Sequence, residues 1–502
     1  HVISFMGQTE RTNVTSVVCL AFLDAANAHP RSATFGLAVL GGVGAFSFEK
    51  MRTAHTRFPA LHDVVIEVNG DYGMSVVPGL QLLLPQLSGF TSITELNLRT
   101  QGLVSFPDSL CALTGLKKLN LNNNKIAALP DAIGDLKELT DLNVACNQLT
   151  ALPDTLGALT RLTELRADGN KFTTLPKPIV KLTSLTKLDL DYTRLVTLPD
   201  SIAALTALQE LDLYGNKFTT LPKPIVKLTS LTKLNLGKNE LVTLPDSFAA
   251  LTALKDLSLW GNRFTPLPKP IAKLTSLTSL NLRSNGLVTL PDSIAALTAL
   301  ETLILANNQL VTLPDWITAL TALKKLHLGY NQLVTLPEPF VKLTRLTKLW
   351  LGSNPLLTLP DATASMTALT DLNLHGNNFM HMYINMIVKL TGLTKLDLSQ
   401  SGGWLSYKLV TLPDSIAALT ALEELSLYGN QLVTLPDSIA ALAALKKLDL
   451  ENNPSLAKPQ SSAVEAWLTA LRAGGCYIRD HPFGLVRGEP FDRRVLAEEE
   501  GW

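Results

Sequence analysis

Apolar residues recur along this chain with a spacing of 23 residues. The stretch from Leu182 to Leu205, LTSLTKLDLDYTRLVTLPDSIAAL, is one such unit. In its first half Leu188 and Leu190 alternate with charged residues, the period-two pattern of a short strand that buries one face. The later leucines and Ile202 point inward from the returning half. One unit cannot cover so many apolar side chains, so neighbouring units must stack and bury them.

Two columns of residues fix this period. The proline of the LP step occurs at positions 107, 130, 153, 176, 199, 222, 245, 268, 291, 314, 337 and 360, and again at 413 and 436. An asparagine column occupies positions 124, 147, 170, 216, 239, 262, 285, 308, 331, 354 and 377, with Thr193 as its one departure. We expect these amides to be structural and to pair with the backbone of adjacent coils. Asp200 or Ser201 is placed to cap a short turn after Pro199.

The written pattern LxxLxxLxLxxNxLxxLPxxIxxL resembles the leucine-rich repeat from about Ile93 to Pro454. The resemblance implies an α/β leucine-rich-repeat solenoid, with a curved, parallel concave β-sheet and short helical or 3₁₀ turns on the convex side. About sixteen repeats are present between N- and C-terminal caps. The LPxxI units are similar to those of intracellular Ras-group leucine-rich repeat proteins, which implies a non-enzymatic scaffold for protein binding.

The ends of the chain depart from the repeat and set the expected boundaries. These are an apolar, partly helical segment (1–62), a cap (63–90), the solenoid (91–454), a cap helix and strand (455–478) and a polar tail (479–502). Val64 to Val68 is expected to be a strand. Val464, Trp467, Leu468 and Leu471 lie at helical spacing within Ser462 to Ala473.

The N-terminal segment leaves three interpretations open. Val17 to Ala26 is expected to be a helix, and with Phe58-Pro59-Ala60-Leu61 it faintly resembles an F-box, which would make the chain a ubiquitin-ligase substrate receptor. Ala33 to Phe48 is free of charge over 16 residues, fewer than the roughly 20 that span a bilayer, so we expect a buried cap segment. A membrane contact through this stretch, in an accessory subunit of a membrane complex, is the remaining alternative.

Charge and cysteine content narrow the function. The 43 basic and 43 acidic residues cancel, which argues against a nucleic-acid partner. The four cysteines are scattered, without the clusters typical of disulfide-bonded caps, so we expect an intracellular, cytoplasmic protein. The chain lacks an initiator Met, and that expectation therefore depends on what precedes His1.

No motif for catalysis, a cofactor, a metal or a small-molecule substrate stands out. Asp168, Asp189, Asp191 and Asp212 lie on neighbouring strands and could bind a metal or share a proton. We favour an acidic contact patch, because cations are interleaved and an open sheet should leave these pKa values unshifted. His375, His381 and nearby methionines could suit a soft metal, but an irregular repeat explains them more simply.

Aromatic residues at strand positions give the strongest functional signal. Six of them should face solvent on the concave side, where interfaces use aromatic anchors. Around Ser401 to Ser406 an insertion should project a loop that carries Trp404. The candidate residues for a protein partner on the concave face are Arg166, Asp189, Asp191, Tyr192, Asp212, Tyr214, Trp260, Arg283, His327, Tyr330, Trp350, His375, Trp404 and Tyr428.

Overall fold

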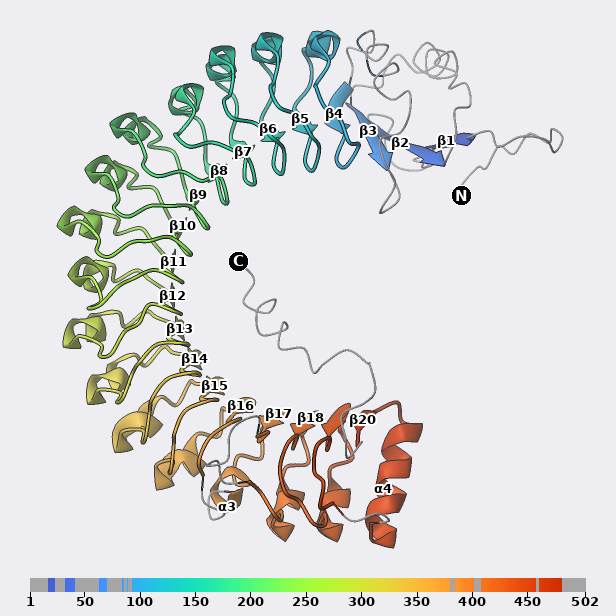
Figure 1. Cartoon of the computed structure of the whole chain (residues 1–502), viewed down its shortest axis with the longest axis vertical. Coiled ribbons are helices and arrows are strands. Elements are labelled where there is room, and N and C mark those ends of the chain that lie inside the picture. The colour runs from blue at the N-terminus through green and yellow to red at the C-terminus, as the bar shows by residue number, and fades with distance from the viewer. Residues whose placement is uncertain are drawn as a thin grey trace, which may run out of the picture. The chain divides into compact units, whose positions relative to one another are not determined.

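The structure is a computed structural model, and it describes residues 17–22, 32–40, 63–69, 84, 88, 93–379, 384–400, 408–456 and 460–480. The chain divides into two compact units, His1–Asn281 and Leu282–Trp502. Each unit is a stack of coils in which a short strand on the inner side alternates with a short helical turn on the outer side (Figure 1).

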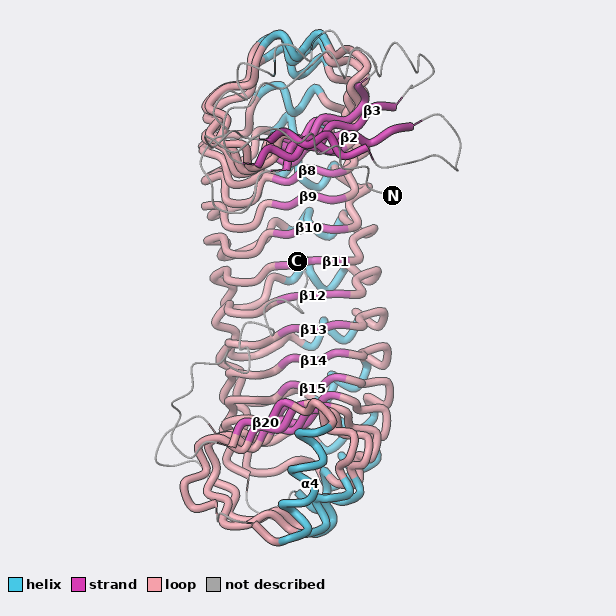
Figure 2. Tube along the Cα trace, turned by 90° about the vertical axis from the view of Figure 1, so that its right-hand side faces the viewer, coloured by secondary structure: helices cyan, strands magenta, loops and turns pink. Residues whose placement is uncertain are grey.

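In the N-terminal unit the repeat strands pair in parallel, each with the next along the chain. Leucines pair with leucines in the register, as Leu188 does with Leu211. The strands lie one above another across the inner face (Figure 2). Including the three strands that precede the repeats, this unit contains β1 (Val17–Phe22), β2 (Ser32–Leu40), β3 (Asp63–Asn69), β4 (Ile93–Asn97), β5 (Lys118–Asn120), β6 (Asp141–Asn143), β7 (Glu164–Arg166), β8 (Lys187–Asp189), β9 (Glu210–Asp212), β10 (Lys233–Asn235), β11 (Asp256–Ser258) and β12 (Ser279–Asn281).

The C-terminal unit repeats this arrangement and ends in a helix. Its strands also pair in parallel in chain order, through to the last strand, which follows the helix. They are β13 (Thr302–Ile304), β14 (Lys325–His327), β15 (Lys348–Trp350), β16 (Asp371–Asn373), β17 (Lys395–Asp397), β18 (Glu424–Ser426), β19 (Lys447–Asp449) and β20 (Tyr477–Arg479), with helices α3 (Ile384–Ile387) and α4 (Ser462–Ala473).

Each LP step is followed by a five-residue 3₁₀ turn. In the N-terminal unit these are η2 (Asp108–Ala112), η3 (Asp131–Asp135), η4 (Asp154–Ala158), η5 (Lys177–Lys181), η6 (Asp200–Ala204), η7 (Lys223–Lys227), η8 (Asp246–Ala250) and η9 (Lys269–Lys273). In the C-terminal unit they are η10 (Asp292–Ala296), η11 (Asp315–Ala319), η12 (Glu338–Lys342), η13 (Asp361–Ser365), η15 (Asp414–Ala418) and η16 (Asp437–Ala441).

The prediction that Asp200 or Ser201 caps its turn is wrong. The N-cap position is Pro199, and no side chain accepts a hydrogen bond there. The Pro199 carbonyl instead accepts a hydrogen bond from Ile202 N at 3.0 Å, which closes the turn through the backbone. Leu205 N in turn donates to Ile202 O at 3.1 Å. So short a 3₁₀ turn leaves few free N–H groups, and a side-chain cap brings little.

The asparagine column forms a buried hydrogen-bond ladder, as the repeat predicts. Asn239 accepts a hydrogen bond from Phe218 N at 3.0 Å and donates to Leu213 O and Leu236 O, each at 3.0 Å. Thr193 replaces one amide by a hydroxyl that bonds to Leu190 O at 2.7 Å. The column therefore pairs backbone groups of successive coils that no sheet ladder satisfies.

The N-terminal residues form strands where a helix is expected. Val17–Phe22 pairs antiparallel with Ser32–Leu40, which in turn lies parallel to Asp63–Asn69. The helix prediction for Val17 to Ala26 is therefore wrong, and with it the helical basis of the F-box resemblance. Apolar and β-branched residues suit strands that extend an existing sheet edge. The strand expected at Val64 to Val68 is confirmed, although two strands precede it.

The other departures from regularity lie in the C-terminal unit. After Asn377 the short helix α3 replaces a 3₁₀ turn. Trp404 and the insertion around it lie outside the described residues, so the loop prediction stays untested. Helix α4 occupies Ser462–Ala473, where apolar spacing predicts it, and Trp467 is buried at 6% exposure. No helix among the described residues is both long and apolar enough to cross a membrane.

Candidate functional site

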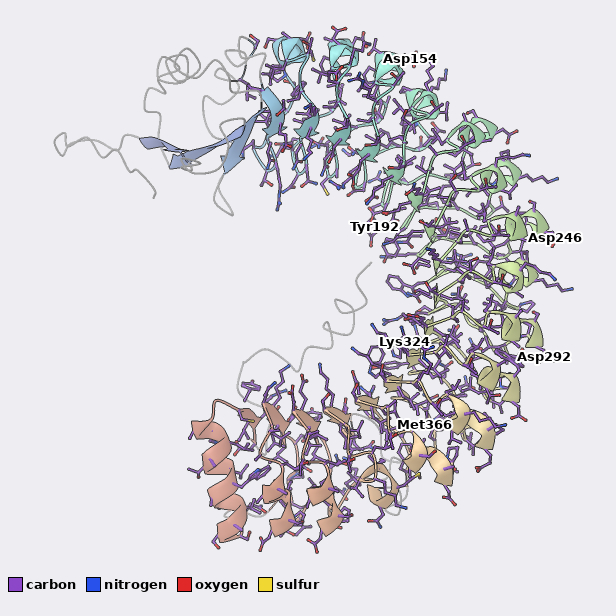
Figure 3. The ribbon with its side chains drawn as sticks, turned by 180° about the vertical axis from the view of Figure 1, so that it is seen from behind. Asp154, Tyr192, Asp246, Asp292, Lys324 and Met366 are labelled. Carbon is purple, nitrogen blue, oxygen red and sulfur yellow. The ribbon has the colours of Figure 1, made fainter. Side chains whose placement is uncertain are left out.

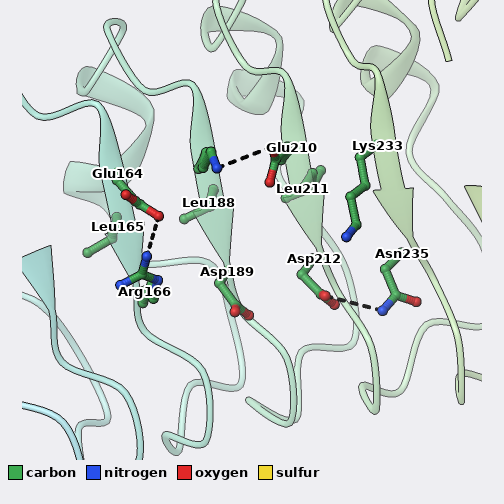
Figure 4. A pocket seen from close by; sticks show the side chains of 11 residues that line it. Glu164, Leu165, Arg166, Leu188, Asp189, Glu210, Leu211, Asp212, Lys233 and Asn235 are labelled. Atoms are coloured by element: carbon green, nitrogen blue, oxygen red, sulfur yellow. Dashed lines mark hydrogen bonds and ion pairs between the residues drawn. The ribbon is translucent and has the colours of Figure 1, made fainter. Parts of the chain in front are cut away.

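The strand face of each unit, which bears the first and third residues of each strand, carries the polar and aromatic side chains. Alternation along a strand places the intervening leucine in the core, as with Leu188 at 2% exposure. In the N-terminal unit the polar side chains of β7 to β10 line an open depression of about 250 Å³ (Figure 4).

The first residues of these strands form a row of paired charges. Register places Glu164, Lys187, Glu210 and Lys233 side by side. Lys187 Nζ lies 3.3 Å from Glu210, and Glu164 binds Arg166 at 2.5 Å (Figure 4). Opposite charges across neighbouring strands are favourable, so this row needs no outside partner.

Farther along the same strands lies a cluster of carboxylates. Asp189 and Asp212 are direct cross-strand neighbours, and Asp168 and Asp191 follow β7 and β8. Oxygens of Asp189, Asp191 and Asp212 lie within 4.8 Å of one another. All four aspartates are half-buried, and none forms an ion pair with any described residue.

Burial and mutual repulsion raise the pKa values of this cluster. Burial, followed by the charges of Asp168 and Asp212, raises the pKa of Asp189 from 3.8 to about 8. The same causes raise the pKa of Asp191 to about 7. The expectation that an open sheet leaves these pKa values unshifted is therefore wrong. Neighbouring side chains withdraw the carboxylates from water, and two nearby cations, Arg166 and Lys187, are paired with glutamates.

A group of aromatic rings adjoins the aspartate cluster, and we call it the aromatic shelf: Tyr192, Tyr214 and Trp260. Tyr214 packs edge-on against Tyr192, with ring centroids 5.2 Å apart, and stacks on Trp260 at 5.4 Å. Lys238 Nζ lies 5.2 Å from the Tyr192 ring centroid and 3.3 Å from Tyr192 Oη. Tyr192 remains 47% exposed on the inner side of the unit (Figure 3).

The backbone at Tyr192 is unusual for an aromatic residue. Its φ is +46°, in the left-handed region, and the equivalent residues of other coils share a positive φ whether they are glycines, as Gly169 and Gly215 are, or not, as with Lys238 and Tyr330. A bulky side chain is disfavoured in this conformation. The coil therefore imposes this backbone on glycine and other residues alike, and at Tyr192 it leaves the ring exposed to solvent.

A second polar and aromatic group occupies the strand face of the C-terminal unit. Trp350 donates from Nε1 to Asp371 Oδ1 at 3.1 Å and packs edge-on to His327 at 5.0 Å. With 9% exposure it is buried, so the expectation that it faces solvent is wrong. Neighbouring side chains on the same face cover the indole. Tyr330 keeps the exposed character expected of it, at 47%.

Near Tyr330 a chain of hydrogen bonds joins three side chains of the C-terminal unit. Ser353 Oγ lies 2.9 Å from His375 Nε2, and His375 Nδ1 lies 2.7 Å from Asn373 Oδ1. Gly352 makes room for the imidazole, since a Cβ there would lie 2.0 Å from His375 Nδ1. Because both imidazole nitrogens of His375 are hydrogen-bonded within the fold, a structural role explains this residue.

The structure thus divides the predicted residues into separate groups. Arg166, Asp189, Asp191, Tyr192, Asp212, Tyr214 and Trp260 lie together in the N-terminal unit, whereas His327, Tyr330, Trp350 and His375 lie in the C-terminal one. Arg283 and Tyr428 are half-buried elsewhere in that second unit, and Trp404 lies outside the described residues. Sequence reasoning missed Lys238, whose contact with Tyr192 spans 46 residues, or two repeats.

The aspartate cluster is also the part of the described chain that comes closest to a metal site. Three carboxylates at this spacing offer the oxygen donors that hard divalent cations prefer. Acidic groups commonly gather on surfaces without a metal, so the cluster alone assigns none. Among His375, His381 and the methionines near them, only His375 and Met386 lie within the described residues.

Comparison with known proteins agrees with this architecture. A family model described as a leucine-rich repeat region matches residues 74–191, 187–263 and 251–331. Further leucine-rich repeat models match residues 321–363 and 421–442. A comparison with curated protein sequences gave no match.

Solved structures of similar fold include bacterial and plant proteins. A leucine-rich repeat protein of Leptospira interrogans is 36% identical, with a TM-score of 0.71 over 79% of this chain and 98% of its own. An internalin of Listeria monocytogenes is 27% identical, with a TM-score of 0.56 over 62% of this chain and 89% of its own. The Arabidopsis receptor kinase HAESA, solved in complex with the peptide hormone IDA and a co-receptor, is 25% identical, with a TM-score of 0.52 over 88% of this chain and 83% of its own.

The repeat columns, the stacked parallel strands and the matches to family models over more than half of the chain lead to one conclusion: the chain belongs to the leucine-rich repeat proteins.

Proposed function

We propose that this chain is a non-catalytic scaffold that binds a protein partner on the strand face of its N-terminal unit. The contact surface is the aromatic shelf together with the aspartate cluster. A protein-binding role is typical of leucine-rich repeat proteins, and HAESA, a relative in fold, was solved with a peptide hormone bound.

Tyr192 is the observation that carries this proposal. Its side chain is 47% exposed, and its ring packs edge-on against Tyr214 beside the aspartate cluster. The ring contributes to no core, so folding gives no reason for it. Exposed tyrosine and tryptophan beside charged groups are what interfaces use as anchors, because each buries a large area with few rotatable bonds.

The proposal is tested by partner capture with a double variant. The full chain and the variant Tyr192→Gly/Trp260→Ala are immobilised, and proteins retained from an extract of the source organism are quantified. We expect at least one partner to be retained by the unaltered chain and lost by about tenfold or more with the variant, as for interface anchors.

A matched control separates the aromatic shelf from general surface stickiness. Val242 is 57% exposed and lies on the returning half of a nearby coil, so Val242→Ala removes apolar surface away from the strand face. It should leave capture unchanged. Equal retention by the unaltered chain and by the double variant, with both folded by circular dichroism, would refute the proposal.

A further inference from the structure

The aspartate cluster indicates the chemistry of the partner, an inference that rests on the function proposed above. Two of the cations at this depression are paired with glutamates: Arg166, the cross-strand neighbour of Asp189, binds Glu164, and Lys187 binds Glu210. The aspartates that follow form no ion pair with any described residue. The strand face thus gathers carboxyl groups that have no ion-pair partner among the described residues, at a depression of about 250 Å³.

Folding does not require these charges. Asp189 and Asp212 each accept a hydrogen bond from the backbone N–H two residues later, at 3.1 and 2.9 Å. Asn143 and Asn235 accept the same bond in neighbouring coils, each at 3.0 Å. A neutral amide therefore performs the structural task. The carboxylates instead bring repulsion and burial that raise the pKa of Asp189 to about 8.

The aromatic shelf next to the cluster already holds a cation. Lys238 Nζ lies over the rings of Tyr192 and Tyr214, at 5.2 and 6.0 Å from their centroids. The electron-rich faces of these rings attract positive charge. Carboxylates on one side and ring faces on the other are the two surfaces that suit a guanidinium, which binds acids through paired N–H groups and stacks on aromatic rings.

We infer that the partner presents a positively charged, extended peptide segment, with an arginine side chain seated over Asp189 and Asp212 and the adjoining residues packed on the aromatic shelf. Charge complementarity selects this partner over an acidic or purely apolar one. A seated guanidinium would neutralise the cluster and release the protons that it holds near neutral pH.

The test is a selection of random peptides displayed on phage against the full chain. We expect arginine to be enriched among the selected sequences, and not when the bait is Asp189→Asn/Asp212→Asn. Those substitutions reproduce the side chain that neighbouring coils carry, so the variant folds. Asp200→Asn, which removes one charge from the outer turn η6, is the control and should select the same peptides as the unaltered chain.

A selected peptide is then measured by fluorescence anisotropy. We expect about tenfold weaker binding when arginine is replaced by the neutral isostere citrulline, and a similar loss with the double asparagine variant. Equal affinity for the arginine and citrulline peptides would overturn the inference. So would calcium that binds the cluster and displaces the peptide, because the carboxylates would then form a cation site.

The two proposals fail in different ways. If the Tyr192→Gly/Trp260→Ala bait loses its partner while Asp189→Asn/Asp212→Asn retains it fully, the aromatic shelf is a docking surface and the inference about its partner's charge is overturned. If neither variant affects capture or peptide selection, the proposal that the strand face binds a protein partner is refuted. Loss with both variants supports both statements.

Discussion

The buried asparagine ladder allows a stability change to be worked out bond by bond. In Asn239→Ala, the side chain that joins two successive coils is removed. Phe218 N loses its acceptor at 3.0 Å, and the two amide N–H groups no longer donate to Leu213 O, Leu236 O and Gly237 O. The three carbonyls keep a partner, because Leu213 O also accepts from Asn216, Leu236 O from Asn262 and Gly237 O from Gly215 N. Only the Phe218 N–H is left buried without a hydrogen bond.

These contacts set the expected magnitude. A buried N–H without a partner costs about 1–3 kcal/mol, and each of the two lost donated bonds about 0.5–1 kcal/mol more. We therefore expect Asn239→Ala to destabilise its coil by roughly 3 kcal/mol. Threonine already replaces this asparagine at position 193, where its hydroxyl donates a hydrogen bond to the Leu190 carbonyl at 2.7 Å. Asn239→Thr should accordingly cost less than alanine.

Hydrogen exchange measures this effect where it occurs. Repeats unfold locally and depend chiefly on their neighbours, so amides of β9 to β11 should exchange roughly a hundredfold faster in Asn239→Ala. Asn97→Ala is the control, because Asn97 is half-buried and, among the described residues, its side chain only accepts a bond from Arg99 N. It should change exchange by less than about threefold. Exchange in Asn239→Ala equal to that of the control would refute the role given to the column.

Two further predictions concern the aspartates and the cap. The pKa of Asp189 is raised by folding from 3.8 to about 8, so the folded chain holds the proton more tightly and loses stability as pH rises through that window. Asp189→Asn should therefore stabilise β7 to β9 by about 1–2 kcal/mol at pH 8, after allowance for solvent screening, and by almost nothing below pH 4. Urea unfolding at the two pH values measures this difference. An equal gain in stability at both pH values would contradict the raised pKa as its cause. Trp467 packs the cap helix against the last repeat and donates to Leu442 O at 3.3 Å. Trp467→Ala should therefore lower the free energy of unfolding by about 3–5 kcal/mol and speed amide hydrogen exchange in β18 to β20, whereas Trp467→Phe should cost far less. Unchanged hydrogen exchange in Trp467→Ala would show that the helix does not close the core.

The sequence by itself determined the coil. A strict 23-residue period with apolar residues at fixed places can bury those residues only if successive coils stack. The asparagine column is explained by the need to pair backbone groups that have no partner in the sheet. The cap helix was equally predictable, because the spacing of Trp467 and its apolar neighbours is helical. Local chemistry decides each of these features.

The tertiary structure determined the features that depend on contacts between residues far apart in the sequence. The sequence predicts a helix that includes Val17–Phe22, but the segment forms a strand because it pairs with the edge of the strand Ser32–Leu40. Trp350 occupies a solvent-facing position, and its neighbours Asp371 and His327 cover it. The raised pKa of Asp189 and the contact of Lys238 with Tyr192 arise between coils, where distance in space bears no relation to distance along the chain. A repeat fixes each residue's face of the sheet, but burial and electrostatics depend on the side chains that happen to stand beside it.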